Sequence, residues 1–375
     1  MNRIIYPVQR AIENATARPG AQPLRVFGVL WPLWQIEITA DVTDGRDYEL
    51  LDSFVTRAVD EAAISTASAI ADFLGLPLAT VNGCMRYLAA IGHVVMAGDQ
   101  LTLTETGQRS LREDRRYETK EVRQHLLFDR FTASPLPRTH YSNAVRLLDR
   151  PVVAPDEVGG VRFTPLFAAT SFNPEIIQAL ARRPDRTAFN VPAALDNVQM
   201  RETRDVFLPA YLVPTTQGLL AYTAVADGRD NFLESLCARA PDVALSLPPM
   251  DVDGVRRHWA EWLRDKHGAQ GRLHQRPNGV WRATLPRQAF ARDSRRRPGS
   301  YVVKNELFLQ LWCDDESLRR DAMYDRAVRT ARSPDFSERM LSELAEQYEL
   351  PTVTVDALRA HAKRTGQDDP FWRST

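Results

Sequence analysis

Cysteines, long apolar runs and targeting signals are scarce in this sequence, and each absence narrows the class of protein. Cys84, Cys237 and Cys313 lie far apart, and no CxxC pair or nearby histidine gives them metal-ligand spacing. We therefore expect reduced thiols, as in a cytoplasmic protein, with no disulfide or metal site. No uncharged run approaches the roughly 20 residues that span a bilayer, and a proline and charged residues interrupt the N-terminal segment. The sequence predicts a cytoplasmic protein without a membrane partner.

Signatures of common enzymes are missing too. The chain has no GxxxxGK[ST], GxSxG, HExxH or HxKxxxxD motif. The acidic run from Asp314 to Glu316 follows an apolar strand, with Lys304 and Glu306 before it, which loosely resembles the acids of a nuclease. The order is reversed, however, and acids at such a place commonly cap a helix. We therefore expect no enzyme, cofactor or metal, with a divergent Mg²⁺-dependent nuclease as the catalytic alternative.

Charge is balanced overall and unevenly distributed along the chain. The 48 basic residues equal the 48 acidic ones. Residues 255–304 nevertheless hold 13 Lys and Arg against 3 Asp and Glu, a net charge of +10. Such a local excess favours a surface that binds nucleic acid or another polyanion. The predicted phosphate contacts are Arg287, Arg292, Arg295, Arg296, Arg297 and Lys304.

Three tryptophans interleave with these arginines, and two roles are open to them. Trp259, Trp262 and Trp281 could stack on unpaired bases. Trp259 and Trp262 are spaced i, i+3 on an expected helix, however, and Trp281 lies in an expected strand. A place in the core is the preferred interpretation for at least two of the three.

Apolar periodicity predicts a series of elements in the first third of the chain. Residues 24–42 are apolar and rich in β-branched and aromatic side chains, which indicates one or two strands broken at Pro32. The pattern then predicts a helix over 47–63, a helix over 67–74 capped by Ser65 or Thr66 and ended by Gly75, a helix from Pro77 to about Ala90, a hairpin around Gly98 and Asp99, and a charged helix from about 105 to 128.

This order of elements over residues 47–128 resembles the winged helix-turn-helix superfamily, and Leu103, Thr104 and Gly107 close the hairpin as in an LTxxG pattern. The resemblance implies that the third helix lies in the major groove of DNA. Its predicted DNA-reading residues are Thr80, Asn82 and Arg86. The alternative is a module that binds protein instead, because Arg86 is the only basic residue on this helix and phosphate contacts supply most of the affinity for DNA.

The segment from Leu344 to Gly366 is a weaker copy of the segment from Ala69 to Gly92. It shares the Leu-Pro turn and the Thr-Val start of the second helix, but Glu349 replaces the turn glycine and no wing follows. A second helix-turn-helix-like pair is possible on this pattern. An amphipathic helix pair that covers a sheet is the favoured alternative.

Together these features predict a multi-domain α+β protein that binds DNA. We expect a transcriptional regulator that forms a homodimer or binds partner proteins. The alternative is a DNA-engaging or scaffold subunit of a larger complex, in defence against mobile DNA or in DNA maintenance. The expected divisions are N-terminal strands in 1–46, a winged helix-turn-helix in 47–128, an α+β sheet domain in 129–313 with a strand over 300–313, and a helical region in 314–375.

Overall fold

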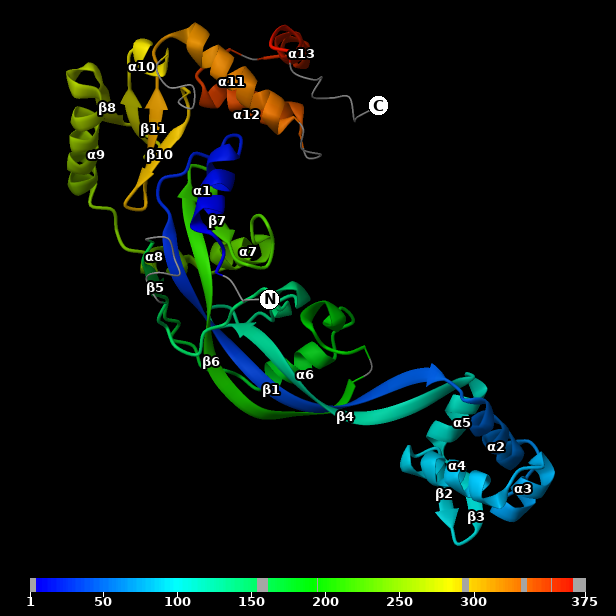
Figure 1. Cartoon of the computed structure of the whole chain (residues 1–375). Helices are drawn as coiled ribbons and strands as arrows, with labels where there is room; N and C mark the ends of the chain where they lie inside the picture. The colour runs from blue at the N-terminus through cyan, green and yellow to red at the C-terminus, as the bar shows by residue number, and fades with distance from the viewer. Residues whose placement is uncertain are drawn as a thin grey trace.

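The structure is a computed structural model that describes residues 5–153, 161–193, 195–291, 297–331, 336–351 and 353–366. The fold is mixed α+β, as expected from the sequence. The molecule is elongated, with a long central sheet that separates a small helical module at one end from a larger lobe at the other (Figure 1).

The central sheet is built around one long strand. Its order is β4-β1-β6-β7, with antiparallel neighbours, and β5 adds a short parallel pairing to β1. A run of β-branched and aromatic residues suits β1, because such side chains pack well on a half-buried pleated surface. The strands are β1 (Phe27–Asp47), β4 (Arg115–Asp129), β5 (Phe163–Pro165), β6 (Leu195–Thr215) and β7 (Gly218–Tyr222).

Pro32 lies inside β1 and does not break it, so the expected interruption is wrong. Pro32 pairs with Phe207 of β6, while Phe207 exchanges both of its backbone hydrogen bonds with Leu148 on its other side. Pro32 and Phe207 therefore form a non-hydrogen-bonded pair, so the missing N–H of proline removes no bond to β6. On its other side Pro32 faces Arg130, just past the end of β4, whose N–H donates to the Pro32 carbonyl.

Helices cover both faces of the central sheet where β1, β6 and β7 lie side by side. Tyr211 of β6 packs with α1, and the next residue, Leu212, packs with α7, because successive side chains of a strand point to opposite faces. The expectation of strands throughout 1–46 is wrong for α1, which buries Ala11 and Ala15 one turn apart. The covering helices are α1 (Val8–Ala17), α6 (Glu175–Ala181), α7 (Asn231–Arg239) and α8 (Pro241–Ser246), and the described chain also has three 3-10 helices, η1 (Arg138–Tyr141), η3 (Arg186–Phe189) and η4 (Gly268–Gln270).

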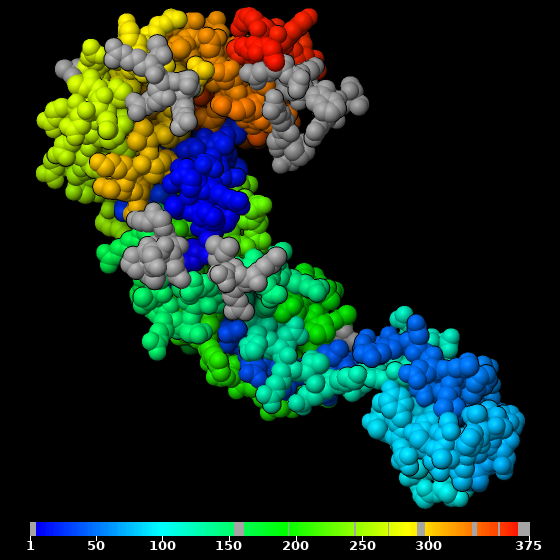
Figure 2. Space-filling model, in the orientation of Figure 1, coloured from blue at the N-terminus to red at the C-terminus, as the bar shows by residue number. Residues whose placement is uncertain are grey.

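Past Val42 the sheet narrows to two strands, β1 and β4, which we call the arm. β6 pairs with β1 only as far as Val42, so Thr43–Asp47 and Arg115–Thr119 continue as a two-stranded ribbon. Residues 48–114, which we call the tip module, join the two ends of this ribbon. The tip module stands apart from the rest of the molecule (Figure 2).

The tip module contains the elements that the sequence predicts up to residue 112. Thr66 caps α3 by accepting from the backbone N–H of Ala69, and Gly75 ends that helix at φ 65°. Thr104 caps α5 in the same way, by accepting from the N–H of Gly107. The elements are α2 (Leu50–Asp60), α3 (Ala67–Leu74), α4 (Leu78–Ala90), β2 (Val94–Ala97), β3 (Gln100–Leu103) and α5 (Glu105–Arg112).

The charged helix expected from 105 to 128 ends at Arg112, and β4 follows it. Asp114 adopts φ 50°, which stops the helix. Most residues at the start of β4 are charged, so the sequence shows no alternation of apolar and polar residues that would predict a strand. The side chains of Arg116 and Glu118 are buried, while Arg115 and Thr119 are exposed, so the first residues of β4 alternate as a strand does.

A buried ionic network fixes the tip module to the arm. Arg116 of β4 lies 3.0 Å from a carboxylate oxygen of Asp52 in α2 and 3.1 Å from one of Glu118. The Tyr87 hydroxyl of α4 donates to Glu118 at 2.7 Å, and the Lys120 ammonium lies 2.7 Å from the same carboxylate. One arginine and one glutamate of β4 thus hold two helices of the tip module.

We call residues 249–366 the C-terminal lobe. Its sheet has the order β10-β11-β9-β8, and the strand expected over 300–313 is a hairpin instead. Asn305 and Glu306 turn the chain with φ 50° and 66°, which the apolar run on either side does not reveal. The elements are α9 (Val252–His267), β8 (Arg272–Gln275), β9 (Trp281–Thr284), α10 (Gln288–Ala291), β10 (Tyr301–Lys304), β11 (Leu307–Trp312), α11 (Glu316–Thr330), α12 (Glu338–Gln347) and α13 (Val355–Arg364).

Protonation of Glu118 should loosen the joint between the arm and the tip module. Hydrogen bonds from Lys120 and Tyr87 lower the pKa of Glu118 from its ordinary value of 4.5 to about 2. A carboxylate whose pKa is lower in the folded state stabilises the fold above the unfolded pKa, and this contribution is lost as the pH falls through the folded pKa. The wild type should therefore lose stability relative to Glu118→Gln between about pH 4.5 and 2, as measured by urea unfolding of both proteins at several pH values. The exposed Glu121→Gln is the control, and an equal pH dependence of both variants would contradict this role of Glu118.

Candidate functional site

The three predicted DNA-reading residues all lie on α4. Thr80 and Arg86 are exposed and Asn82 is half-buried, while Val81, Met85 and others face the module's core. Arg86 makes no hydrogen bond or ion pair with any described residue, so its guanidinium is available to a partner. Asn82 and Arg86, four residues apart, share one face of α4, whereas Thr80 lies on the other flank of the helix, as a period of about 3.6 residues per turn requires.

The remaining surface of the tip module is acidic and apolar. Residues 48–114 contain four basic and nine acidic residues, a net charge of −5. Two of the four basic residues are held in ion pairs, Arg57 with Glu61 and Arg109 with Glu113. Twelve large apolar side chains are exposed in the described part of the chain, and seven of them belong to this module: Leu50, Phe54, Phe73, Leu78, Tyr87, Val95 and Met96.

The predicted phosphate contacts of the basic stretch divide into three groups. Arg287 is paired with Asp315 at 2.6 Å, and Arg297 lies 3.9 Å from Asp325 inside a cleft. Lys304 is exposed and makes no ion pair with a described residue. Arg292, Arg295 and Arg296 lie outside the described residues.

The tryptophans of the basic stretch cannot stack on bases, because all three are buried. Trp259 and Trp262 belong to the core of the C-terminal lobe together with Trp281. At most 9% of each residue's surface is exposed. The preferred interpretation, that at least two of them lie in the core, therefore holds for all three.

Cations that the candidate set lacked lie on the outer face of α9. Trp259 and Trp262 bury the inner face, which leaves Arg257 and Arg264 exposed on the opposite side together with Glu261 and Asp265. Arg256 is exposed at the flank of the helix and Lys266 at its end. None of these four makes an ion pair with a described residue. The charge of Lys304 lowers the pKa of His258 on α9, after the larger effect of burial, so Lys304 lies near this helix. The helical spacing of Trp259 and Trp262 could have predicted these exposed cations, because it identifies the buried face of the helix and so the face that is left to solvent.

The tip module and the C-terminal lobe are far apart. The backbone of Leu24 and Val26, just before β1, is bonded to the β10–β11 hairpin of the lobe, whereas β1 ends at the tip module. A strand of 21 residues is up to about 70 Å long, at roughly 3.3 Å per residue. Seventy ångströms of duplex hold about 20 base pairs. A short DNA site therefore cannot contact α4 and the cations of α9 together on one copy of the chain.

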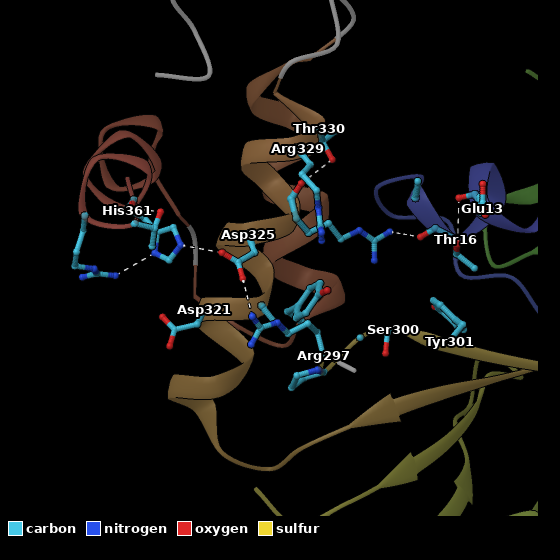
Figure 3. A pocket seen from close by; sticks show the side chains of 18 residues that line it. Glu13, Thr16, Arg297, Ser300, Tyr301, Asp321, Asp325, Arg329, Thr330 and His361 are labelled. Carbon is cyan, nitrogen blue, oxygen red and sulfur yellow. Dashed lines mark hydrogen bonds and ion pairs between the residues drawn. The ribbon is translucent and has the colours of Figure 1, made fainter. Parts of the chain in front are cut away.

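The C-terminal lobe also contains a polar cleft. It has a volume of ≈ 1430 Å³ and lies between α1, α11, α13 and the loop before β10 (Figure 3). Asp325 lies between Arg297 and His361, whose Nε2 is 3.3 Å from a carboxylate oxygen of Asp325. The His361 ring stacks on Tyr324 with centroids 4.8 Å apart. His361 is therefore held by its neighbours, which suits a structural role better than a catalytic one.

The charges lining this cleft nearly cancel. Arg326 donates to the backbone carbonyls of Thr16 and Arg18, and so ties α11 to the C-terminal end of α1. Basic Arg297, Arg326, Arg329 and Arg364 face acidic Glu13, Asp321 and Asp325. The cleft could hold a polar molecule, but its balance of charges selects neither an anion nor a cation.

The acids of the nuclease hypothesis have structural partners. Asp315 caps α11 by accepting from the backbone N–H of Leu318, and Asp314 is paired with Arg272. No group of three or more His, Cys, Asp or Glu that could hold a metal ion occurs within the described ranges. The N-cap, which the sequence offered as the simpler explanation, is the role that the structure gives to Asp315.

The C-terminal helix pair packs on α11 and forms a three-helix unit with it. Leu341, Leu344 and Leu358 share a core with Met323 of α11, so the pair covers a helix as well as the sheet. Glu349, which stands in the place of the turn glycine, adopts φ 54°. This left-handed conformation costs about 1–2 kcal/mol for a residue with a side chain.

Two arginines explain the glutamate at this strained position. Arg282 of β9 lies 2.7 Å from Glu349, and Arg276 lies 3.0 Å from the same oxygen. The Arg282 side chain is only 3% exposed, so Glu349 supplies the negative charge that a buried guanidinium requires. A glycine would relieve the backbone but would leave Arg282 without this partner.

None of the described helices combines the length and apolar character of a membrane span. No protein-family model, curated protein or solved structure matches this chain. Its function therefore has to be inferred from the chemistry of the surfaces described above.

Replacement of Glu349 should separate backbone strain from charge pairing. We expect Glu349→Gly to destabilise the protein by about 2 kcal/mol, because loss of a partner by buried Arg282 outweighs the relief of the left-handed conformation. Asn305→Gly is the matched control, since Asn305 has φ 50° and no hydrogen bond or ion pair within the described ranges. It should change the free energy of unfolding by at most about 1 kcal/mol, toward greater stability. Urea unfolding of both variants tests this, and a stabilised Glu349→Gly would show that the ion pair is unimportant.

Proposed function

We propose that this protein is a nucleic-acid-engaging subunit of a larger assembly, with a winged helix at its tip that binds a protein. The C-terminal lobe binds the nucleic acid through α9, and the arm holds the winged helix away from it. The tip module supports this fold assignment through the order of its elements, α2, α3, α4, the hairpin β2–β3 and α5.

The observation that carries the proposal is the surface of the tip module. Of the twelve large apolar side chains exposed within the described ranges, seven lie on the 67 residues of the tip module, which carry a net charge of −5. A DNA-binding surface needs cations, because phosphate contacts supply most of its affinity. An excess of exposed large apolar side chains, in contrast, is typical of a protein interface. The partner that fits is a protein with an apolar centre and a basic rim, which would complement the acidic charge of the module.

The C-terminal lobe has the opposite charge. Residues 249–366 contain 22 basic and 17 acidic residues, a net charge of +5. Arg256, Arg257 and Arg264 of α9 are exposed and make no ion pair with described residues. Arginine presents a planar fork that matches phosphate oxygens, which makes this face the best candidate for contacts to a nucleic-acid backbone.

Substitutions in α9 of the C-terminal lobe and in α4 of the tip module should affect nucleic-acid binding differently. We expect the triple variant of Arg256, Arg257 and Arg264 to Gln to weaken DNA binding and to reduce the salt slope by about 3, since each phosphate contact contributes about 0.9. Asn82→Ala with Arg86→Ala should leave both quantities unchanged. Fluorescence anisotropy of the full chain, titrated with salt on duplex and single-stranded DNA, measures this. The opposite pattern would overturn the proposal and favour base reading by α4.

The tip surface should be needed for assembly and dispensable for folding. We expect Phe73→Asp with Val95→Asp to shift the protein from a large complex to monomer size in native gel filtration of its host's extract. Both side chains are about 60% exposed, at 62% and 59%, so the substitutions should change stability by less than about 0.5 kcal/mol each. Leu245→Asp, at an 82% exposed site outside the tip module, is the control and should not shift. An unchanged size of the double variant would contradict the docking role.

A second candidate function is a transcriptional regulator that reads DNA with α4. The unpaired guanidinium of Arg86 and the neighbouring Asn82 favour it, because these side chain types recognise guanine and adenine in the major groove. For this candidate, Asn82→Ala with Arg86→Ala should abolish the preference between duplex sequences in the same anisotropy experiment.

A further inference from the structure

A second cavity in the C-terminal lobe lies at the edge of its sheet. It has a volume of ≈ 590 Å³ and lies between the β8–β9 hairpin, the end of β11 and the turn between α12 and α13. This volume falls within the range of about 300–1,000 Å³ that small-molecule sites occupy. We call it the arginine pocket, because Arg272, Arg276 and Arg282 line it together with His274.

Arg282 forms part of the wall of the arginine pocket and is held rigidly. Its Nε donates to Gln310 at 2.9 Å, its Nη1 donates to Glu349 at 2.7 Å, and its guanidinium carbon lies 3.6 Å from the centre of the Trp312 ring. Its Nη2 is buried and has no hydrogen-bond partner. Unpaired buried donors are rare, and an acceptor that reached this nitrogen from the pocket would complete the hydrogen bonding of Arg282.

The arginine pocket has an excess of positive charge. Three arginines face two carboxylates, Asp314 and Glu349, which leaves a net charge of +1. Burial lowers the pKa of His274, and the charges of Arg282, Arg272 and Arg276 lower it further.

The pair between Arg272 and Asp314 can be exchanged for a ligand. Their side chains are 76% and 66% exposed, and exposed pairs contribute little because water and salt screen them. Arg276 and Arg282 share one oxygen of Glu349, so neither is saturated by it. An anion in the pocket therefore meets Arg272, whose exposed side chain can change rotamer, and Arg276 and Arg282, which Glu349 holds in position.

We propose that the arginine pocket binds a terminal phosphate of a ligand of nucleotide size. The phosphate belongs either to a free mononucleotide or to the phosphorylated end of a nucleic-acid strand. The first source goes beyond the proposed function and does not depend on it. The second deepens it and rests on nucleic-acid binding by the C-terminal lobe.

The test is isothermal titration of the full chain with inorganic phosphate, AMP and adenosine. We expect saturable binding of phosphate and AMP and none of adenosine. Arg272→Gln and Arg276→Gln should each weaken AMP binding at least about tenfold, since a hydrogen bond to a charged group contributes that much. Arg320→Gln is the control, because Arg320 is exposed, belongs to the same lobe and does not line the pocket.

A second readout separates binding from a structural effect of the arginines. A phosphate dianion in the pocket should raise the pKa of His274, which NMR titration of the histidine side chain follows with and without saturating AMP. Absence of saturable phosphate and AMP binding, or equal affinities of Arg272→Gln and Arg320→Gln, would overturn the proposal.

Oligonucleotides distinguish the two sources of phosphate. If a strand with a 5′- or 3′-phosphate binds about tenfold more tightly than the same strand with free hydroxyls, the ligand of the pocket is the phosphorylated strand end. This gain in affinity should vanish in Arg272→Gln. AMP binding without such a gain assigns the free nucleotide. DNA binding that needs the α9 arginines while phosphate and AMP fail to bind would reject the pocket and leave the proposed function in place.

Discussion

The continuous strand β1 is the constraint on which the rest of the structure depends. It pairs with β6 over most of its length, with β4 from Leu33 to its end, and with β5 near its start. The lobe at one end and the tip module at the other are thus connected through one set of ladder hydrogen bonds. Because β1 and β4 finish in register at Asp47 and Arg115, the 67 residues between them form a separate folded module at the end of the ribbon.

The separation of the two ends divides the charge of the protein. The tip module has a net charge of −5 and the C-terminal lobe one of +5, and neutral overall composition conceals both. Charges at the two ends of β1 do not neutralise each other, since the Debye length is about 8 Å at physiological ionic strength and the strand is many times longer. Each end therefore has the charge that its partner in the proposed function requires, acidic for a basic protein surface and basic for a nucleic acid.

Two buried arginines perform the same task at opposite ends of the molecule. Arg116 joins β4 to α2, and Arg282 joins β9 to the turn before α13. In each place a carboxylate from a different part of the chain compensates the charge, which makes the contact specific because an unpaired buried charge is strongly unfavourable. The strained backbone of Glu349 follows from this requirement.

The sequence by itself determined the local elements of the tip module. Thr66, Gly75 and Thr104 specify helix ends through hydrogen bonds and backbone conformations that involve only nearby residues. The helical spacing of Trp259 and Trp262 likewise predicted their burial. These features are predictable because the physical cause lies within a few residues of the effect.

Only the tertiary structure decided which strands pair with one another and which charged side chains form ion pairs. Pro32 is tolerated because of how Phe207 is bonded, and β4 forms because β1 is beside it, although its own residues are mostly charged. Arg287 is paired with Asp315, whereas the α9 arginines are free of such partners among described residues. Strand pairing and ion pairing join residues that are distant in the sequence, so no local pattern encodes them.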